Sequence, residues 1–211
     1  AYLVLNGELP NPKQLKKFLK DERSSRNLSK QILQDLKKMP KKAHPMDVIR
    51  TVVSLMALED KDTSNNSKEA NMRKALRIFA AAPTAVAAYF RIRKGKKIIR
   101  PDKKLSFSEN FLKMMLGKVP DKEIVKAFDV SMILYAEHSF NVSTFTARTI
   151  TSSLSDMHGA ITGAIASLKG PLHGGANEAV MYMFKEIRKP KKAKAWIEDA
   201  IEKKKVIMGF G

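Results

Sequence analysis

The fold class follows from residues 69–93, EANMRKALRIFAAAPTAVAAYFRIR. This stretch is long and rich in alanine, and its pattern predicts a helix. Pro83 lies inside it and should kink or split that helix, because proline lacks a backbone N–H and its ring clashes with the preceding turn. The chain on both sides continues the helical pattern.

Before this stretch we predict helices over 13–20 and 30–39, the second capped by Ser29, and a third that begins at Pro45. Residues 60–67 are polar without periodicity and predict a loop. After it, Ile98-Ile99 suggests one short strand. Further helices are predicted over residues 106–116, 121–135, 143–153, 156–168, 178–188 and 191–204. The sequence therefore predicts an all-α fold of ten or so helices with almost no sheet.

The composition restricts the classes of protein to consider. The 211 residues include no cysteine, which excludes disulfides and thiolate metal sites and fits a cytoplasmic location. The longest nearly uncharged apolar run, residues 78–90, is interrupted by Pro83 and is shorter than the roughly 20 residues that cross a bilayer. We therefore expect no membrane partner, and the opening residues lack the basic leader of a signal peptide.

The charge is strongly basic, with 40 Lys and Arg against 21 Asp and Glu and a net charge of +19. Such a charge suits nucleic acid, an anionic membrane or an anionic small substrate. The lysines occur in pairs along the whole length and favour a solvated surface. The aromatic residues do not interleave with the basic pairs, so we expect no nucleic-acid partner.

The first motif that suggests chemistry is GPLHGGAN, Gly170 to Asn177, with His173 at its centre. Glycines permit positive φ and a close approach of the backbone to a ligand. A helix starting near Ala176 would direct its N–H groups to the same place, which favours an anion. A neutral His173 there could donate a hydrogen bond to an enolate oxygen. The equal alternative is a solvated histidine in a helix-initiating turn.

The second motif is AEHSFNVSTFTAR, Ala136 to Arg148, which presents His138 and Asn141. His138 follows an apolar helix, so the alternative is a histidine that binds the last carbonyls of that helix. His44 is interpreted as structural, and His158 as structural or part of an interface. The HExxH, Walker and G-x-S-x-G motifs are absent, which argues against those metalloprotease, phosphate-loop and hydrolase sites.

With these two motifs, the chain resembles the citrate synthase family over essentially its whole length. Three other segments share the likeness: AYLVLNGELP at 1–10, HPMDVIRT at 44–51 and VIMGFG at 206–211. The resemblance implies an all-α, multi-helical large domain over residues 1–169 and the beginning of a small domain over 170–211. It also implies a homodimer, with residues 156–168 and 80–88 as our candidates for the interface.

The activity implied by the resemblance is condensation of an acyl-CoA, acetyl-CoA or propionyl-CoA, with oxaloacetate to give citrate or 2-methylcitrate and free CoA. His173 would bind the thioester carbonyl oxygen. Oxaloacetate would be bound by His138 and Asn141. The resemblance places CoA against Leu172, Gly174, Val206, Ile207, Met208, Gly209, Phe210 and Gly211. It implies no metal and no cofactor beyond the thioester substrate, and residues 137–141 look more like the 2-methylcitrate synthases.

The family pattern continues after GFG with a second catalytic histidine, an arginine and an aspartate base, whereas this sequence ends at Gly211. We therefore expect it to be part of a longer chain and expect the 211-residue polypeptide alone to be inactive. Two other functions stay open: a basic helical nucleic-acid-binding protein and a catalytically inactive helical module.

Overall fold

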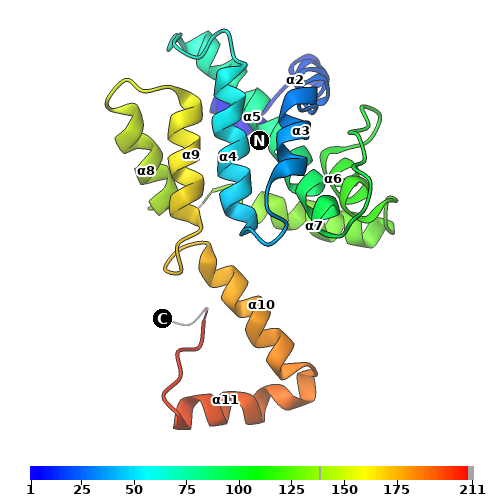
Figure 1. Ribbon diagram of the computed structural model, residues 1–211, viewed down its shortest axis with the longest axis vertical. Helices are drawn as coiled ribbons and strands as arrows, with labels where there is room; N and C mark the ends of the chain where they lie inside the picture. Colours follow the sequence, from blue (N-terminus) through cyan, green and yellow to red (C-terminus); the bar gives the residue numbers. More distant parts are fainter. Residues whose placement is uncertain (138, 209–211) are drawn as a thin grey trace. The chain divides into compact units, whose positions relative to one another are not determined.

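The computed structural model describes residues 1–137 and 139–208. They fall into two compact units, Ala1–Ile165 (unit 1) and Ala166–Gly211 (unit 2), and each unit is described by itself. Within the described residues every regular element is a helix, which confirms the predicted all-α fold (Figure 1). The predicted strand at Ile98-Ile99 is wrong: the backbone there is irregular, and no second strand among those residues offers it a partner.

Unit 1 holds nine helices among its described residues, and the last of them crosses into unit 2. They are α1 (Tyr2–Asn6), α2 (Pro12–Ser24), α3 (Lys30–Lys38), α4 (Pro45–Leu58), α5 (Lys68–Arg93), α6 (Phe107–Leu116), α7 (Lys122–Leu134), α8 (Val142–Thr151) and α9 (Met157–Leu168). The described part of unit 2 continues with α10 (Gly175–Ile187), the short 3₁₀ helix η1 (Pro190–Lys192) and α11 (Ala193–Glu202).

The long helix α5 is the centre of unit 1. It packs against α2, α3, α4 and α6, and it is continuous through Pro83, so the predicted split is wrong. Packing on several sides holds the helix together where proline removes one backbone hydrogen bond. Its small side chains let neighbouring helices approach closely, and the alanines at 80, 81, 85, 87 and 88 are buried inside unit 1. Much of the stretch 80–88 therefore packs inside unit 1, and its assignment to a subunit interface stays a prediction.

By length and composition, α5 is also apolar enough to cross a membrane, and it is the one such helix within the described ranges. More than half of its most apolar window is buried inside the structure, at 56%. A central core helix passes the same test, and that is the role α5 has here.

The core of unit 1 forms where α3, α4 and α5 present their apolar faces to one another. Ile32, Leu36, Val52, Val53 and Met56 are each 2% exposed or less. The Tyr89 ring is buried with them, and its hydroxyl donates to the carbonyls of Pro40 at 2.7 Å and Ala43 at 3.1 Å. These bonds satisfy the one polar atom of a large buried side chain.

The sequence signals for helix ends are confirmed at three places. The Ser29 side chain accepts from the Ile32 N–H at 3.0 Å, and Pro45 is the first residue of α4. Gly117 ends α6 with φ of +101°, a left-handed conformation that strongly favours glycine. Residues 60–67 form the predicted loop.

Helix α9 packs closely on α8 in unit 1 (Figure 1). A Cβ added to Gly163 would lie 2.2 Å from Cδ1 of Ile150, so the end of that side chain would have to move to accept a larger residue. On another side, Met157, Ile161 and Ile165 pack against the unit 1 core. The small residues of 156–168 were predicted to permit close helix packing. At Gly163 that close packing is made to Ile150 of the same chain.

Candidate functional site

The glycine-rich segment of the first motif is a tight turn that leads into α10. The His173 N–H donates to the Gly170 carbonyl at 3.0 Å, and the Gly175 N–H donates to the same carbonyl at 3.0 Å. His173 is half-buried at the apex. The backbone around this imidazole is therefore fixed by hydrogen bonds inside the turn itself.

The glycines of this turn serve close packing rather than positive φ. The positive-φ glycines among the described residues are Gly7, Gly95 and Gly117. A Cβ on Gly174 would lie 2.6 Å from the Leu168 carbonyl oxygen, and one on Gly175 would lie 2.7 Å from the Gly170 carbonyl oxygen. The prediction that these glycines adopt positive φ is wrong. The backbone does come close to other groups at Gly174 and Gly175, and these groups are carbonyls of the same chain.

Helix α10 begins at Gly175, one residue before the start near Ala176 that the motif predicts and three before the predicted 178–188 helix. The Ala176 N–H donates to the His173 carbonyl at 3.1 Å, and the Asn177 N–H donates to the Gly174 carbonyl at 3.1 Å. These first-turn N–H groups therefore already have partners within the turn, contrary to the predicted anion-facing arrangement. The helix dipole still places partial positive charge beside His173.

In the second motif, His138 lies outside the described residues. Asn141 is the N-cap of α8, and its side-chain oxygen accepts from the Thr144 N–H at 2.9 Å and from the Ser143 hydroxyl. Phe140 has φ of +59° and a fully exposed ring. A phenylalanine in the left-handed region is strained, and such strain is frequent at functional sites.

The predicted CoA contacts lie in unit 2. Leu172 is 98% exposed in the glycine turn beside Gly174, and Val206, after α11, is 82% exposed. Ile207 and Met208 are half-buried, while Gly209, Phe210 and Gly211 lie outside the described residues. The prediction that His138 and His173 face one cavity stays a prediction, since the first is not described and the second belongs to unit 2.

The other two histidines have different surroundings. His44 is the N-cap of α4, and its Nδ1 accepts from the Met46 N–H at 3.2 Å, in line with the predicted structural role. His158, at the start of α9, is fully buried between Asp60 and Asp156. Sequence reasoning missed this cluster because Asp60 is far away along the chain. The Asp156-x-His158 spacing was the only local signal.

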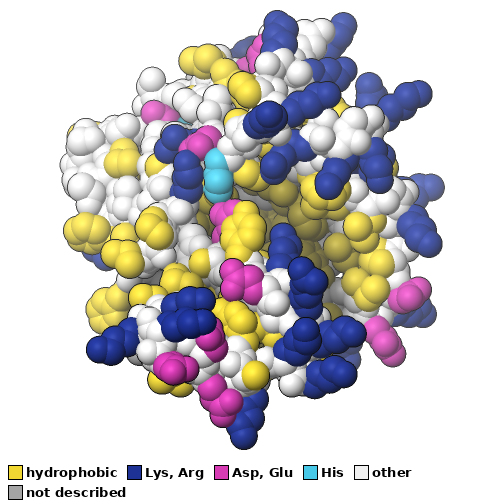
Figure 2. Space-filling model, turned by 60° about the horizontal axis from the view of Figure 1, so that its bottom comes forward, with side chains coloured by type: hydrophobic (Ala, Val, Ile, Leu, Met, Phe, Trp, Pro, Cys, Tyr) yellow, Lys and Arg dark blue, Asp and Glu magenta, His cyan; other side chains and the backbone are white. Residues whose placement is uncertain are grey.

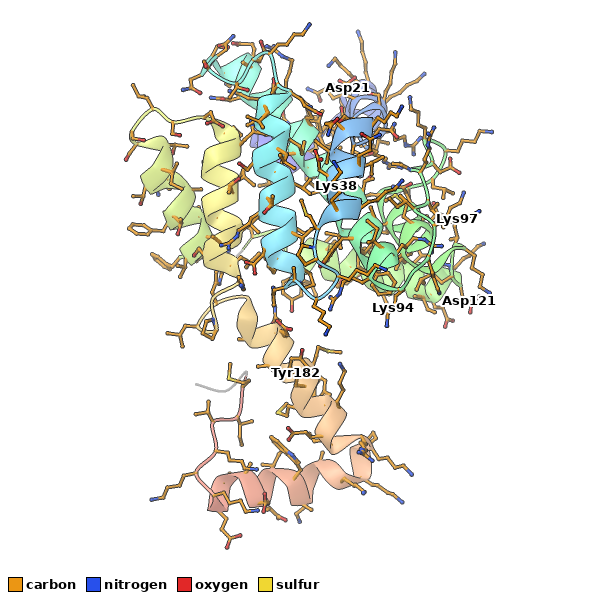
Figure 3. The ribbon with its side chains drawn as sticks, in the orientation of Figure 1. Asp21, Lys38, Lys94, Lys97, Asp121 and Tyr182 are labelled. Atoms are coloured by element: carbon orange, nitrogen blue, oxygen red, sulfur yellow. The ribbon has the colours of Figure 1, made fainter. Side chains whose placement is uncertain are left out.

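The basic residues lie mostly on the surface. Lys38, Lys94 and Lys97 are exposed on unit 1 (Figure 3). On the face shown in Figure 2, Lys and Arg side chains occur in several separate places between apolar patches, and acidic side chains are few. A cavity of about 260 Å³ in unit 1, lined by Tyr2, Phe18 and Leu76 among others, contains none of the predicted site residues.

Comparison with known proteins places this geometry in a family. The family profile described as "Citrate synthase, C-terminal domain" matches residues 1–211. The chain belongs to the citrate synthase family. The resemblance that the two histidine motifs indicated is therefore confirmed over the whole chain.

Two related sequences show how far the likeness extends. The chain is 48% identical over 211 residues to a citrate synthase of Mycolicibacterium smegmatis, covering 100% of this chain and 56% of that protein. It is also 48% identical to a 2-methylcitrate synthase of Mycobacterium tuberculosis strain H37Rv, covering 53% of that protein. The chain spans about half the length of the citrate synthase family relatives it matches.

Solved structures of the citrate synthase family agree with the fold. The citrate synthase of Thermotoga maritima matches with a TM-score of 0.84 and 36% identity, over 100% of this chain and 55% of that one. A citrate synthase from Thermoplasma acidophilum, solved as a ternary complex with carboxymethyl coenzyme A and oxaloacetate, matches with a TM-score of 0.89 and 30% identity. That match covers 100% of this chain and 55% of the other.

Proposed function

We propose that the protein containing this chain condenses an acyl-CoA with oxaloacetate to give citrate or 2-methylcitrate and free CoA. The observation that carries the proposal is the family match over all 211 residues, which includes both histidine motifs. Relatives at 48% identity are named citrate synthase and 2-methylcitrate synthase. The proposed enzyme is cytoplasmic and uses no metal or further cofactor.

The reaction removes a proton from the α-carbon of the thioester, and the resulting enol attacks the ketone carbon of oxaloacetate. Water then cleaves the thioester bond and releases CoA. Because the α-proton is a very weak acid, the developing enolate oxygen requires a positioned hydrogen-bond donor. His173 has this role in the proposal, supported by its fixed turn and by the dipole of α10.

The remaining site residues keep the roles that the family resemblance implies. His138 and Asn141 bind oxaloacetate, while Leu172 and Gly174 border the thioester. The backbone of residues 206–211 contacts the pantetheine and the adenine. The exposure of Leu172 and Val206 is compatible with surfaces that a large substrate covers.

Replacement of His173 tests the proposal directly. In the intact protein that contains this chain, we expect His173→Ala to lower kcat by roughly 10²–10³-fold, the usual cost of losing an oxyanion donor. Release of free CoA from acetyl-CoA or propionyl-CoA with oxaloacetate is the measurement. His44→Asn is the matched control, because asparagine can still cap α4 while another imidazole is removed. Full turnover by His173→Ala would refute the assigned role.

The choice of acyl group requires its own measurement. One methylene in an apolar pocket discriminates by only about 1–3 kcal/mol, so use of both thioesters is compatible with one site. Residues 137–141 favour propionyl-CoA in our proposal. The ratio of kcat/KM for propionyl-CoA and acetyl-CoA decides the preference.

We also propose that the protein is a homodimer. Large apolar side chains are exposed in unit 1 from the end of α7 to α8: Ile133, Leu134, Tyr135, Val142 and Phe145. An exposed apolar group of this kind is typical of an interaction surface. Sedimentation of the intact protein tests the assembly.

A further inference from the structure

The connector between α5 and α6 in unit 1, residues 94–106, is strongly basic. Its sequence, KGKKIIRPDKKLS, contains six cationic residues and one acidic residue. Figure 3 shows Lys94 and Lys97 at the outer edge of unit 1. All six cationic residues are exposed: Lys94, Lys96, Lys97, Arg100, Lys103 and Lys104. The connector therefore presents a dense group of positive charges to solvent.

The backbone of this connector is held in place, although it has no regular secondary structure. Arg26 is 1% exposed and donates from Nη1 to the carbonyls of Asp102 at 2.8 Å and Leu105 at 3.0 Å. The Asp102 N–H donates to the side chain of buried Asn110 at 2.7 Å. Ile98 packs against the core of unit 1. Because the backbone is already fixed, a ligand that binds these cations does not have to order the loop.

The one acid of the connector does not neutralise these charges. Asp102 is half-buried, its Oδ2 pairs with Lys113 of α6 at 2.9 Å, and its Oδ1 accepts from the Lys104 N–H at 2.9 Å. Within the part of the chain that the structure describes, none of the six connector cations forms an ion pair. In α11, by contrast, Lys194 and Lys203 each pair with an acid one turn away. Positive charges crowded on one surface repel one another, and an anionic ligand relieves that repulsion.

A second basic loop lies beside the connector. The Arg93 side chain, at the end of α5, donates from Nε to the Lys41 carbonyl at 3.1 Å. The Tyr89 hydroxyl donates to the Pro40 carbonyl at 2.7 Å. These bonds hold exposed Lys41 and Lys42 near the place where the connector begins. The connector and this lysine pair together form what we call the basic surface, with two more exposed cations than the connector alone.

The kind of ligand follows from what the basic surface lacks. The apolar residues of the connector are half-buried: Ile98, Ile99, Pro101 and Leu105. Stable protein interfaces favour aromatic, methionine and arginine side chains and are poor in lysine. Firm attachment to a membrane takes an apolar or lipid anchor in addition to a polybasic segment. A phosphate backbone needs only closely spaced positive charges, because its binding is driven by the release of counterions.

We propose that the basic surface binds the phosphate backbone of duplex nucleic acid without reading its sequence. Single strands are held by aromatic side chains that stack on bases, and the connector contains no aromatic residue, which favours a duplex. The expectation of no nucleic-acid partner depended on the same lack of aromatic residues. That lack argues against base stacking, whereas contacts with phosphates do not require it. The binding is independent of the proposed condensation reaction.

Binding of the intact protein to a labelled DNA duplex of mixed sequence tests the proposal. Fluorescence anisotropy measures the affinity as the salt concentration is raised. Each neutralised phosphate contributes about −0.9 to the slope of log affinity against log salt, so six connector contacts give a slope of about −5. Duplexes of unrelated sequence should bind alike. Absence of binding at low salt, or a clear preference for one sequence, would overturn the proposal.

Removal of two charges separates the basic surface from the net charge of the chain. Lys96→Gln/Lys97→Gln should weaken binding to every duplex and make the salt slope shallower by about two. The matched control, Lys61→Gln/Lys68→Gln, removes two exposed lysines at the other end of α5, about 39 Å away along this 26-residue helix. The control should bind as the parent does. Equal losses in the two variants would overturn the proposal in favour of general attraction by the net charge of +19.

Competing anions decide between kinds of partner. Polyglutamate and vesicles of anionic phospholipid, each at the same concentration of negative charge as the duplex, should fail to displace it. The charges of the duplex lie only about 1.7 Å apart along its axis, so it gains most from counterion release. Displacement by polyglutamate would overturn the proposal in favour of an acidic protein, and displacement by vesicles in favour of a membrane.

A second variant covers the case in which the first does not fold, as judged by far-UV circular dichroism. Lys103→Gln/Lys104→Gln removes two other exposed cations of the connector. The same change of about two in the salt slope is expected. An unchanged slope in this variant would overturn the proposal.

Discussion

The two compact units differ in how they use their apolar residues. Unit 1 buries nearly all of the large apolar side chains that the described structure buries, most of them on α3, α4 and α5. In the described part of unit 2 only Ile187 and Ala200 are buried apolar residues. Large apolar side chains remain exposed there: Leu172, Met181, Tyr182, Phe184, Ile201 and Val206. Unit 1 therefore carries its own core, whereas the described part of unit 2 leaves most of its large apolar side chains exposed.

The polar contacts differ in the same way. In unit 2, the Tyr182 hydroxyl donates to Glu178 at 3.2 Å and the Lys185 ammonium lies 5.1 Å from the Tyr182 ring centre, both in solvent (Figure 3). In unit 1, Arg26 is 1% exposed and binds buried Glu22 with two nitrogens, at 2.7 and 2.8 Å. Exposed pairs contribute little to stability, while breaking a buried pair is costly.

The largest expected effect compares two ion pairs of equal spacing. Arg26→Met leaves the Glu22 carboxylate buried without its partner and removes donors to the carbonyls of Asp102 and Leu105. We expect a loss of about 3–5 kcal/mol in the free energy of unfolding. The counterpart Lys203→Met breaks the exposed pair with Asp199 and should have little effect.

Urea unfolding with two probes measures this difference. In the 211-residue polypeptide measured by itself, the one tryptophan, Trp196, lies in unit 2, so its fluorescence follows that unit, and far-UV circular dichroism follows mainly the helices of unit 1. Arg26→Met should shift the dichroism transition. Equal costs for Arg26→Met and Lys203→Met would contradict the distinction between the units.

A smaller loss of stability is expected when an isoleucine is replaced by alanine, and the two units can be compared because each offers one. Ile32 is 2% exposed in the core of unit 1, and Ile201 is 63% exposed at the end of α11. Ile32→Ala should cost about 2–5 kcal/mol through lost burial and the cavity left behind. Ile201→Ala should cost less than about 0.5 kcal/mol if that surface is open to water. A cost for Ile201→Ala as large as that for Ile32→Ala would mean that another surface covers α11 in solution.

The same contrast explains how much of the fold could be predicted from the sequence. In unit 1, helix ends were found because Ser29, Pro45 and Gly117 act through local backbone chemistry. The continuity of α5 through Pro83 could not be found, because it depends on neighbouring helices that the local pattern does not contain. At Pro83, packing against neighbouring helices outweighs the tendency of proline to break a helix.

The glycine turn of the candidate site was predictable from the sequence, and its internal packing was not. The GPLHGGAN motif identified the turn at His173, but its spacing gave no sign that Gly174 and Gly175 pack against carbonyls of residues 168–170. The Asp60–His158–Asp156 cluster was missed because it joins a loop and a helix distant in sequence. Contacts of long sequence separation leave no periodic trace in one sequence.

The smallest expected effect concerns helix capping, which side chains provide at several helices of unit 1 and at neither α10 nor α11. The Ser29 hydroxyl caps α3 and donates to Glu59 at 2.5 Å, whereas the N-cap residues of α10 and α11, Gly174 and Lys192, make no side-chain cap. Ser29→Ala should lower the free energy of unfolding by about 1 kcal/mol, because the Ile32 N–H loses its acceptor. Ser29→Thr keeps the oxygen and should lose less. The shift is expected in the dichroism transition, and a shift confined to Trp196 fluorescence would show that α3 does not belong to the cooperative core of unit 1.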